Sequence, residues 1–414
     1  MILGPVSLID CAVFCVLLAP QLILHIGLFR TIYFALRALP FLVLRMPASL
    51  VKDRFVLRRD QRSPFVARAT LFEDLVVRCV RYAFAEIPAN VGRVFFSKAV
   101  ALPFLRWRMA RHGFVRSPVT WKEYKQEGPD GFRGIWISAD PSMVPDMVLY
   151  YVHGGGFAMG STYFYLEFLL AWHALLCKAG YRNPAIFALE YSLVPDQTYP
   201  TQVHETLRGY RHVLSAVGDP AKVVVGGDSA GGTLVLTMLL ELGQLSSARA
   251  CKKKIEQEVS NSERQQYWRS AYETPLPGLA VLISPWVTLI SAKHDNSTSD
   301  YLDKYQLHEY AMQYAGRDHI SDRTASPGLC TDRQLWANAS PRCGFFVMYG
   351  SEEVFAPEIK EFIETAVRAA EVDSRKETGG IHAWPVASLF LSSSEEQRLR
   401  GLRTLTVSIR KHIL

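Results

Sequence analysis

The segment that most constrains this chain is a run of valines followed by a serine set among glycines. Val223–Val225 leads into Gly227-Asp228-Ser229-Ala230-Gly231, and the apolar residues that follow have helical spacing. The spacing Gly227-x-Ser229-x-Gly231 is that of a nucleophile elbow, a sharp turn between a strand and a helix that exposes the serine hydroxyl. Glycines are needed there because the tight turn leaves no room for side chains beside the serine. Ser229 is therefore a candidate nucleophile, supported by Gly227, Asp228 and Gly231.

A second glycine-rich motif, His153-Gly154-Gly155-Gly156-Phe157, directly follows the apolar run Met147–Val152. Consecutive glycines let backbone N–H groups converge on one point without obstruction, which is what stabilisation of a developing oxyanion requires. A glycine-rich turn that only reverses the chain is the alternative, but the serine motif downstream argues against it. We expect His153 to be structural, with its ring bracing the loop through hydrogen bonds.

Apolar runs that read as buried strands alternate with helical patterns over the last three hundred residues. Such alternation predicts an α/β fold with a mostly parallel sheet covered by helices on both faces. Catalytic groups in such sheets gather at the carboxyl ends of the strands. The predicted strands are near Thr120–Tyr124, Gly134–Ile137, Met147–Val152, Ala185–Leu189, Val223–Val225, Leu279–Ile283 and Phe345–Tyr349.

Together the two motifs resemble the hormone-sensitive lipase family of α/β-hydrolases. Tyr191–Asp196, Tyr199-Pro200 and Ser284–Val287 resemble further segments of that family, and the resemblance runs from about Val119 to the C-terminus. It implies the α/β-hydrolase fold, with a mostly parallel eight-stranded sheet flanked by helices. Together with the apolar N-terminal run, the chain is most similar to membrane-anchored arylacetamide deacetylases and fungal steryl acetyl hydrolases.

The family order of catalytic residues is serine, acid, histidine. Gly380–Pro385 resembles the family's histidine loop, so His382 is the expected base. The acid should follow the strand Phe345–Tyr349, where Glu352 and Glu353 adjoin. The family pattern of an acid, one residue and an apolar side chain fits the register starting at Glu353 better than the one starting at Glu352. Glutamate can replace the usual aspartate because the acid only orients the imidazole and stabilises its cation.

The resemblance implies a serine carboxylic ester hydrolase that needs no metal and no organic cofactor. Ser229 would attack an ester carbonyl, with the N–H groups of Gly154, Gly155 and Ala230 holding the oxyanion and Gly156 supporting the loop. Asp228 is expected to point away from the serine and brace the site. An acyltransferase or amidase with the same triad, or a non-enzymatic ligand-binding relative, are the alternatives. His382 argues against the last of these.

The N-terminal region is almost wholly apolar from about Val6 to Leu28, long enough for a helix to cross a bilayer. We favour an uncleaved membrane anchor over a signal peptide because Met1–Pro5 lacks a basic side chain. Cys11 and Cys15 lie in this run and are expected to act as small hydrophobic residues. A second apolar stretch, Ile32–Leu44, is too short for a confident second span, and would be an interfacial helix or the return arm of a hairpin.

Charge is concentrated beside the anchor. Residues 1–62 hold eight Lys and Arg against three Asp, a net +5 out of the chain's +7, so the remainder is nearly neutral and unsuited to nucleic acid. A membrane and a lipophilic small-molecule ester, such as an acetylated sterol or terpenoid, are the expected partners; the oligomeric state stays open.

We expect residues 1–50 to be the membrane anchor, 51–117 a helical cap, and 118–414 the catalytic domain with a polar insertion near 243–276. The aromatic residues of the helical cap are interpreted as core. An endoplasmic reticulum membrane is the expected location. The basic flank favours a cytosolic domain, whereas the glycosylation sequon at Asn296 favours a lumenal one, so the orientation stays open.

Overall fold

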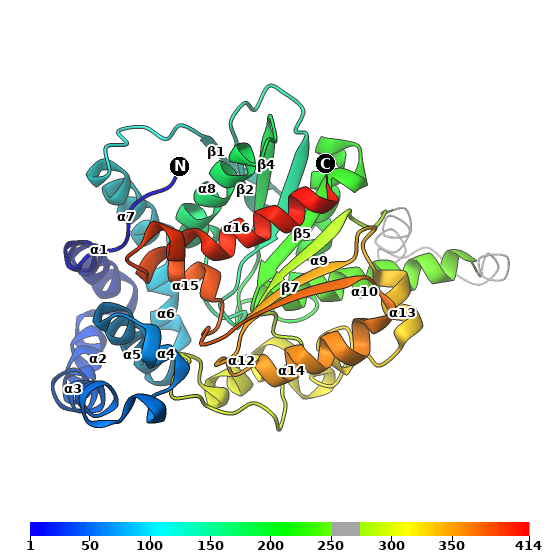
Figure 1. Cartoon of the computed structure of the whole chain (residues 1–414). Coiled ribbons are helices and arrows are strands. Elements are labelled where there is room, and N and C mark those ends of the chain that lie inside the picture. The colour runs from blue at the N-terminus through cyan, green and yellow to red at the C-terminus, as the bar shows by residue number, and fades with distance from the viewer. Residues whose placement is uncertain (129, 251–273, 414) are drawn as a thin grey trace.

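Eight strands form one mixed sheet through the centre of the molecule, and helices cover both of its faces (Figure 1). The computed structural model describes residues 1–128, 130–250 and 274–413. The strands are β1 Thr120–Gln126, β2 Phe132–Ser138, β3 Met147–Val152, β4 Pro184–Glu190, β5 Val223–Asp228, β6 Leu279–Ile283, β7 Phe345–Gly350 and β8 Val372–Glu377.

The strand order is β1-β2-β4-β3-β5-β6-β7-β8. Strand β2 pairs antiparallel with β1 and with β4, and all other neighbours are parallel. The carboxyl ends of β3, β5, β6 and β7 therefore meet at one edge of the sheet, where catalytic groups of such folds gather. The mostly parallel, eight-stranded sheet expected from the resemblance is confirmed.

Two hydrophobic layers hold the sheet between its helices. In β3, Val148, Tyr150 and Val152 face one layer, while Leu149 and Tyr151 face the other, as the two-residue repeat of a strand requires. The first layer is covered by α9 Thr201–Val217, α10 Ala230–Ala250, α12 Lys304–His319, α13 Arg333–Ala339 and α14 Ala356–Glu361; the second is covered by α7 Lys98–Arg111, α8 Thr162–Lys178, α15 Trp384–Leu391 and α16 Glu395–His412.

Short helical turns connect several of the larger elements. Helix α10 continues to Ala250, into the predicted polar insertion near 243–276, and residues 251–273 of that insertion lie outside the described residues. The turns are 3₁₀ segments at Arg59–Gln61, Pro220–Lys222, Pro327–Leu329 and Val367–Ala369, and a π-helical segment at Phe362–Ala366.

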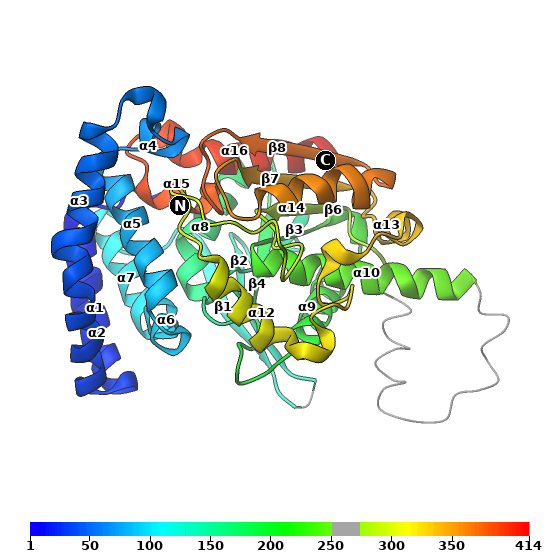
Figure 2. The same cartoon turned by 90° about the horizontal axis from the view of Figure 1, so that it is seen from below.

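Two apolar helices lie against one side of the catalytic domain (Figures 1 and 2). Helix α1 spans Leu8–Ile26, and after Gly27 a second helical run continues for 29 residues from Leu28 to Val56. Both are long and apolar enough to cross a membrane, so the prediction that the second stretch is too short is wrong. The two runs have the form of a hairpin. The second contains α2 Leu28–Pro40 and α3 Met46–Val51, with π-helical segments at Phe41–Arg45 and Lys52–Val56.

The second run packs antiparallel along helix α5, which spans Leu71–Glu86. The stack of Phe41 on Tyr82, with ring centroids 4.2 Å apart, lies near the middle of this contact. Ion pairs lie along the rest of it, where Arg37 bonds Glu86 at 2.7 Å and Arg78 bonds Asp53 at 2.8 Å. The run is thus attached to the predicted helical cap, whose other helices are α4 Pro64–Arg68, α6 Ala89–Phe96 and α7.

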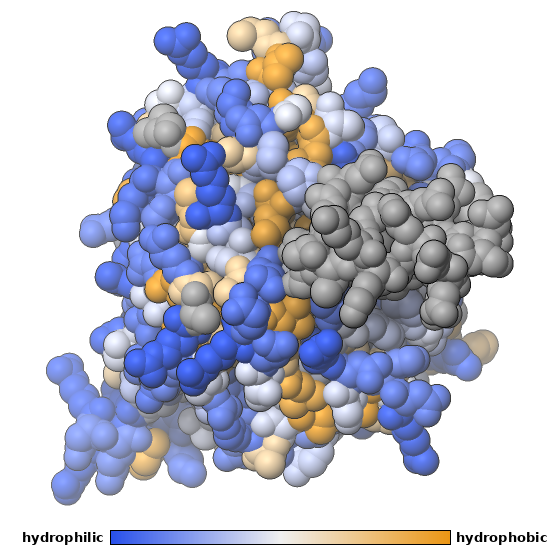
Figure 3. All heavy atoms as spheres, turned by 90° about the vertical axis from the view of Figure 1, so that its right-hand side faces the viewer, coloured by the Kyte–Doolittle hydropathy of each residue, from blue (hydrophilic) through white to orange (hydrophobic). Residues whose placement is uncertain are grey.

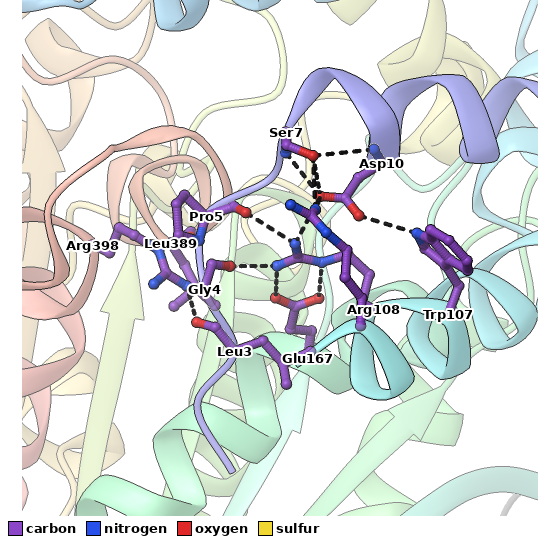
Figure 4. A network of polar contacts seen from close by, with 11 residues as sticks. Leu3, Gly4, Pro5, Ser7, Asp10, Trp107, Arg108, Glu167, Leu389 and Arg398 are labelled. Carbon is purple, nitrogen blue, oxygen red and sulfur yellow. Dashed lines mark hydrogen bonds and ion pairs between the residues drawn. The ribbon is translucent and has the colours of Figure 1, made fainter. Parts of the chain in front are cut away.

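The residues before α1 are tied to the catalytic domain by a buried guanidinium (Figure 4). Arg108 of α7 is fully buried and donates five hydrogen bonds. Two go to Glu167 of α8, at 2.7 and 3.2 Å, and one goes to Asp10 of α1, at 3.2 Å. The other two go to the carbonyl oxygens of Gly4 and Pro5. Every N–H of this side chain therefore has an acceptor.

Arg108→Met is expected to lower the free energy of unfolding by about 3–5 kcal/mol, because Glu167 would be left buried without its main counter-charge and Asp10 would keep only Arg111. Denaturant unfolding in a fixed detergent would measure the loss. The matched control is Arg403→Met, because the Arg403–Glu395 pair is exposed and such pairs contribute little. Equal losses in the two variants would contradict a structural role for the buried network.

Candidate active site

The predicted elbow is formed where β5 ends and α10 begins. Ser229 lies between them with a φ of 51°, and its N–H donates to the carbonyl of Ile283 on the next strand at 3.1 Å. A Cβ on Gly227 would lie 2.7 Å from the carbonyl oxygen of Val152, and one on Gly231 would lie 2.0 Å from the same atom. The two glycines are therefore required by close backbone packing, as the sequence predicts.

The glycine loop follows β3 and lies beside the elbow. Gly155 and Gly156 have φ values of 121° and 62°, a region that L-residues rarely adopt. The N–H of Gly154 donates to Asp228 Oδ1 at 2.9 Å. This N–H is therefore already engaged, which conflicts with the prediction that Gly154 holds the oxyanion. The sequence could not reveal this contact because it joins residues 74 positions apart.

Asp228 braces the site, as expected from the sequence. Its buried carboxylate also accepts hydrogen bonds from the hydroxyls of Tyr151 at 2.7 Å and Tyr165 at 2.6 Å. Burial raises its pKa, and the two tyrosine hydrogen bonds oppose that rise. The ring of His153 is buried and stacks on Tyr191, with centroids 4.4 Å apart, in agreement with a structural role.

His382 and Glu353 face each other at the carboxyl edge of the sheet. His382 Nδ1 lies 3.5 Å from Glu353 Oε2, and both side chains are buried. Glu352 is directed elsewhere, and its two oxygens accept hydrogen bonds from the hydroxyls of Ser299 and Ser351, each at 3.2 Å. Of the two adjoining acids, Glu353 is therefore the one beside the histidine.

Burial dominates the electrostatics of this pair. It raises the pKa of Glu353 to about 8, and the nearby Ser284 and the backbone at Gly350 and Ala383 oppose that rise only in part. Burial also lowers the pKa of His382, although nearby Asp300 and Asp228 act in the opposite direction. The resting imidazole is thus neutral, the form in which it can accept a proton.

Asp300 joins the two loops that carry the acid and the histidine, a role that the sequence does not reveal. Its Oδ1 accepts the backbone N–H of His382 and its Oδ2 accepts that of Val354, each at 2.9 Å. Burial raises the pKa of Asp300 to about 6. Ser284 has a similar role, because its hydroxyl accepts the N–H of Ala383 at 3.0 Å. No local motif marks Asp300, since its partners lie far along the chain, whereas Ser284 opens the segment Ser284–Val287 that resembles the family.

A cavity of about 450 Å³ contains the site. Ser229, His382 and the glycine loop line it, together with apolar side chains of α1, α5, α6, α7, α8, α12 and α15. Phe84, Phe96 and Phe104 are among them, so these aromatic residues of the helical cap contribute to a pocket and not only to a core. Within residues 1–128, 130–250 and 274–413, no group of three or more His, Cys, Asp or Glu could hold a metal ion.

The predicted glycosylation residue, Asn296, is exposed in the segment that precedes α12. Its side-chain amide donates to Asp303 at 2.7 Å, and its carbonyl accepts the N–H of Lys304 at 2.7 Å. Its modification stays a prediction.

The sheet, the elbow and the glycine loop define this molecule as an α/β-hydrolase. A family profile described as alpha/beta hydrolase fold matches residues 149–386. The chain belongs to this family, in its branch similar to hormone-sensitive lipase.

Individual relatives agree with that membership. The protein named "Putative steryl acetyl hydrolase mug81" of Schizosaccharomyces pombe is 28% identical over 64% of this chain and 67% of its own length. Steryl acetyl hydrolase 1 of Saccharomyces cerevisiae is 25% identical over 58% of this chain, and this chain spans only half of its length. A solved esterase of the bacterial hormone-sensitive lipase family shares the fold with a TM-score of 0.60, at 21% identity over 83% of this chain and 99% of that one.

Proposed function

We propose that this chain is a serine carboxylic ester hydrolase that acts on lipophilic esters, among them acetylated sterols or terpenoids. The observation that carries the proposal is the approach of His382 Nδ1 to Glu353 Oε2 at 3.5 Å, with His382 and Ser229 both lining one cavity. The names of the relatives, steryl acetyl hydrolases, support an acetyl ester as the substrate. The apolar lining of the cavity supports a lipophilic one.

The mechanism follows from this arrangement. Because Nδ1 of His382 faces Glu353, Nε2 is left to take the proton of Ser229 as its Oγ attacks the ester carbonyl carbon. The carboxylate of Glu353 stabilises the imidazolium that forms. His382 then returns the proton to the leaving alcohol, and an acyl group stays on Ser229. Water attacks this acyl-enzyme, with His382 again taking the proton, and the carboxylic acid is released.

The oxyanion needs backbone donors that have no other acceptor. We assign this role to the N–H groups of Gly155, Gly156 and Ala230, in place of Gly154, whose N–H donates to Asp228. Ala230 is the first residue of α10, so its N–H lies at the positive end of that helix. Loss of one such donor typically raises the barrier by about 2.7–4 kcal/mol.

The test is direct measurement of ester turnover by the full-length protein in detergent. Cholesteryl acetate and p-nitrophenyl acetate should both release acetate, and a fluorophosphonate should label Ser229. Added alcohol should not redirect most of the acyl group into a new ester, which an acyltransferase would do. No acetate release together with no labelling would overturn the proposal.

The pH profile of kcat/KM on p-nitrophenyl acetate is expected to rise towards a plateau above about pH 8. The pKa of Glu353 is raised to about 8, so the carboxylate that stabilises the imidazolium predominates only above that pH. The lowered pKa of His382 means that its imidazole is neutral at the pH where this rise is expected. Initial rates from pH 5 to 9, corrected for uncatalysed hydrolysis, would locate the rise. A single rise centred below pH 6 would contradict the assignment to Glu353.

A further inference from the structure

Helix α1 is apolar all round, yet its two sides have different surroundings. On the inner side, Cys11, Phe14 and Cys15 line the cavity that contains Ser229, and Leu18 packs one turn further along against helices α6 and α7. These positions follow the spacing of one helical face. Helix α1 therefore forms one wall of the cavity, although its length and hydropathy would also allow it to cross a membrane.

Both ends of α1 are held against the rest of the protein. Arg108 binds the carbonyls of Gly4 and Pro5 just before the helix and the side chain of Asp10 in its first turn (Figure 4). At its other end, Ile26 packs on the cluster formed with Val94 and Val100 of the cap. Helix α1 therefore packs against the rest of the protein along its whole length. A helix that served only as an anchor would instead extend away from the protein.

The outer sides of α1 and of the run 28–56 expose large apolar side chains. Phe29 is 87% exposed, and Val16 is 72% exposed. On the opposite side of the molecule, outside the residues drawn in grey, hydrophilic residues predominate and apolar ones form a narrow stripe and scattered spots (Figure 3). A continuous apolar surface on one side only is the mark of a lipid- or protein-binding face. Its other large exposed members are Leu8, Ile9, Ile23, Leu24, Leu28, Ile32, Tyr33, Leu36, Leu39, Leu42, Val43, Leu44, Val51, Phe55 and Val56.

The cavity reaches the surface beside this face. Cys15 of α1 and Val80 of α5 both line the cavity and are both exposed, so solvent-accessible surface of the cavity lies at these two helices. Basic side chains follow directly at the end of the apolar run, at Arg58, Arg59 and Arg62, and suit contact with lipid headgroups.

We propose that α1 is a wall of the ester-binding pocket, and that the outer side of α1–α3 lies in one leaflet of a bilayer so that esters dissolved in lipid reach Ser229 between α1 and α5. This inference rests on the proposed function. The occupant of the pocket is the large apolar half of the ester. The two N-terminal helical runs, α1 and residues 28–56, then take part in substrate binding as well as tethering the enzyme to the membrane.

The first test uses two native cysteines. Ser229 is labelled with an alkyl phosphonofluoridate, its Oγ bonding to phosphorus as fluoride and the hydroxyl proton leave. A hexadecyl chain on the phosphonate should slow alkylation of Cys15 by N-ethylmaleimide about tenfold, because a thiol covered nine-tenths of the time reacts at a tenth of the rate. A methyl phosphonate should not. Cys177 on α8 is also exposed but lies outside the cavity lining, so it serves as the control.

The outcomes separate the two proposals. If Ser229 is not labelled, the proposed function fails. If Ser229 is labelled by both reagents and Cys15 reacts equally fast in each case, the function stands and the role of α1 is overturned.

A second test places a larger side chain in the pocket wall formed by α1. Cys11→Trp should lower kcat/KM for cholesteryl acetate at least about tenfold more than for p-nitrophenyl acetate, since misfits in apolar pockets cost about 10- to 200-fold. Both substrates form the same acetyl-enzyme, so a difference reports binding of the alcohol. Val16→Trp introduces the same large side chain on the outer side of α1. It should not alter the ratio of kcat/KM for the two substrates. An unchanged ratio in Cys11→Trp would overturn the inference.

A third test introduces a negative charge on the outer side of the helical pair, where we propose contact with the bilayer. Phe29→Glu should lower the partition of the protein into phosphatidylcholine vesicles about tenfold, because a carboxylate disfavours burial in lipid. Val407→Glu changes a side chain that is 68% exposed on α16, away from the helical pair, and should not alter partition. Equal partition of wild type and Phe29→Glu would overturn the lipid-facing assignment.

Discussion

Replacing Ser229 with alanine is expected to lower kcat on p-nitrophenyl acetate by about 10⁴- to 10⁶-fold, the loss typical of removing a serine nucleophile. The change removes only the Oγ atom. The backbone contacts of the elbow persist, because they are made by the N–H and carbonyl of this residue with Ile283, Thr233 and Trp286. The variant should therefore fold normally, which near-ultraviolet circular dichroism would verify.

The control for this prediction is Ser215→Ala, an exposed serine near the end of α9. Residual activity in the Ser229 variant should resist fluorophosphonate, because the labelled atom is gone. If Ser229→Ala hydrolysed short acyl esters as fast as the wild type, the serine mechanism would be wrong.

Glu353→Gln is expected to lower kcat by about 10⁴-fold, since an uncharged amide neither stabilises the imidazolium nor holds the required tautomer. Its size is nearly unchanged, so the buried site keeps its packing. Glu352→Gln is the matched control. That side chain bonds Ser299 and Ser351 and not the histidine, so its loss should change kcat only severalfold.

Steady-state kinetics of the two glutamine variants, measured side by side above pH 8, would decide between them. A large loss in Glu352→Gln with a small one in Glu353→Gln would reverse the assignment of the acid. Large losses in both would indicate that the loop after β7 collapses when either charge is removed, and thermal unfolding would reveal that collapse.

The elbow and the glycine loop are predictable from sequence because their constraints are local. Gly227 and Gly231 are required by the turn around a single serine, and the turn can be recognised from five residues. The alternation of apolar runs with helical patterns likewise predicts the parallel sheet. His382 is found from the order of motifs along the chain.

Contacts between distant segments are not predictable in the same way. Two adjoining acids fit the register after β7, and only the folded chain turns Glu353 towards His382 and Glu352 away. The hydrogen bonds of Asp300 to the backbone of both loops cannot be recognised from the spacing of residues in the sequence. The N–H of Gly154 is taken by Asp228 for the same reason.

The hydropathy of the N-terminal segment likewise does not predict which surroundings its helices have in the folded protein. An apolar helix escapes water equally well in a bilayer or against a protein cavity, so the sequence of α1 predicts only that it avoids water. The sequence by itself determined the elbow serine, because the turn around it depends on backbone geometry within a few residues, and its resemblance to a known family indicated the α/β-hydrolase class and the histidine loop. The tertiary structure decided which acid faces the histidine, that the N–H of Gly154 donates to Asp228 and that α1 borders the pocket, because those depend on distances between segments far apart in the chain.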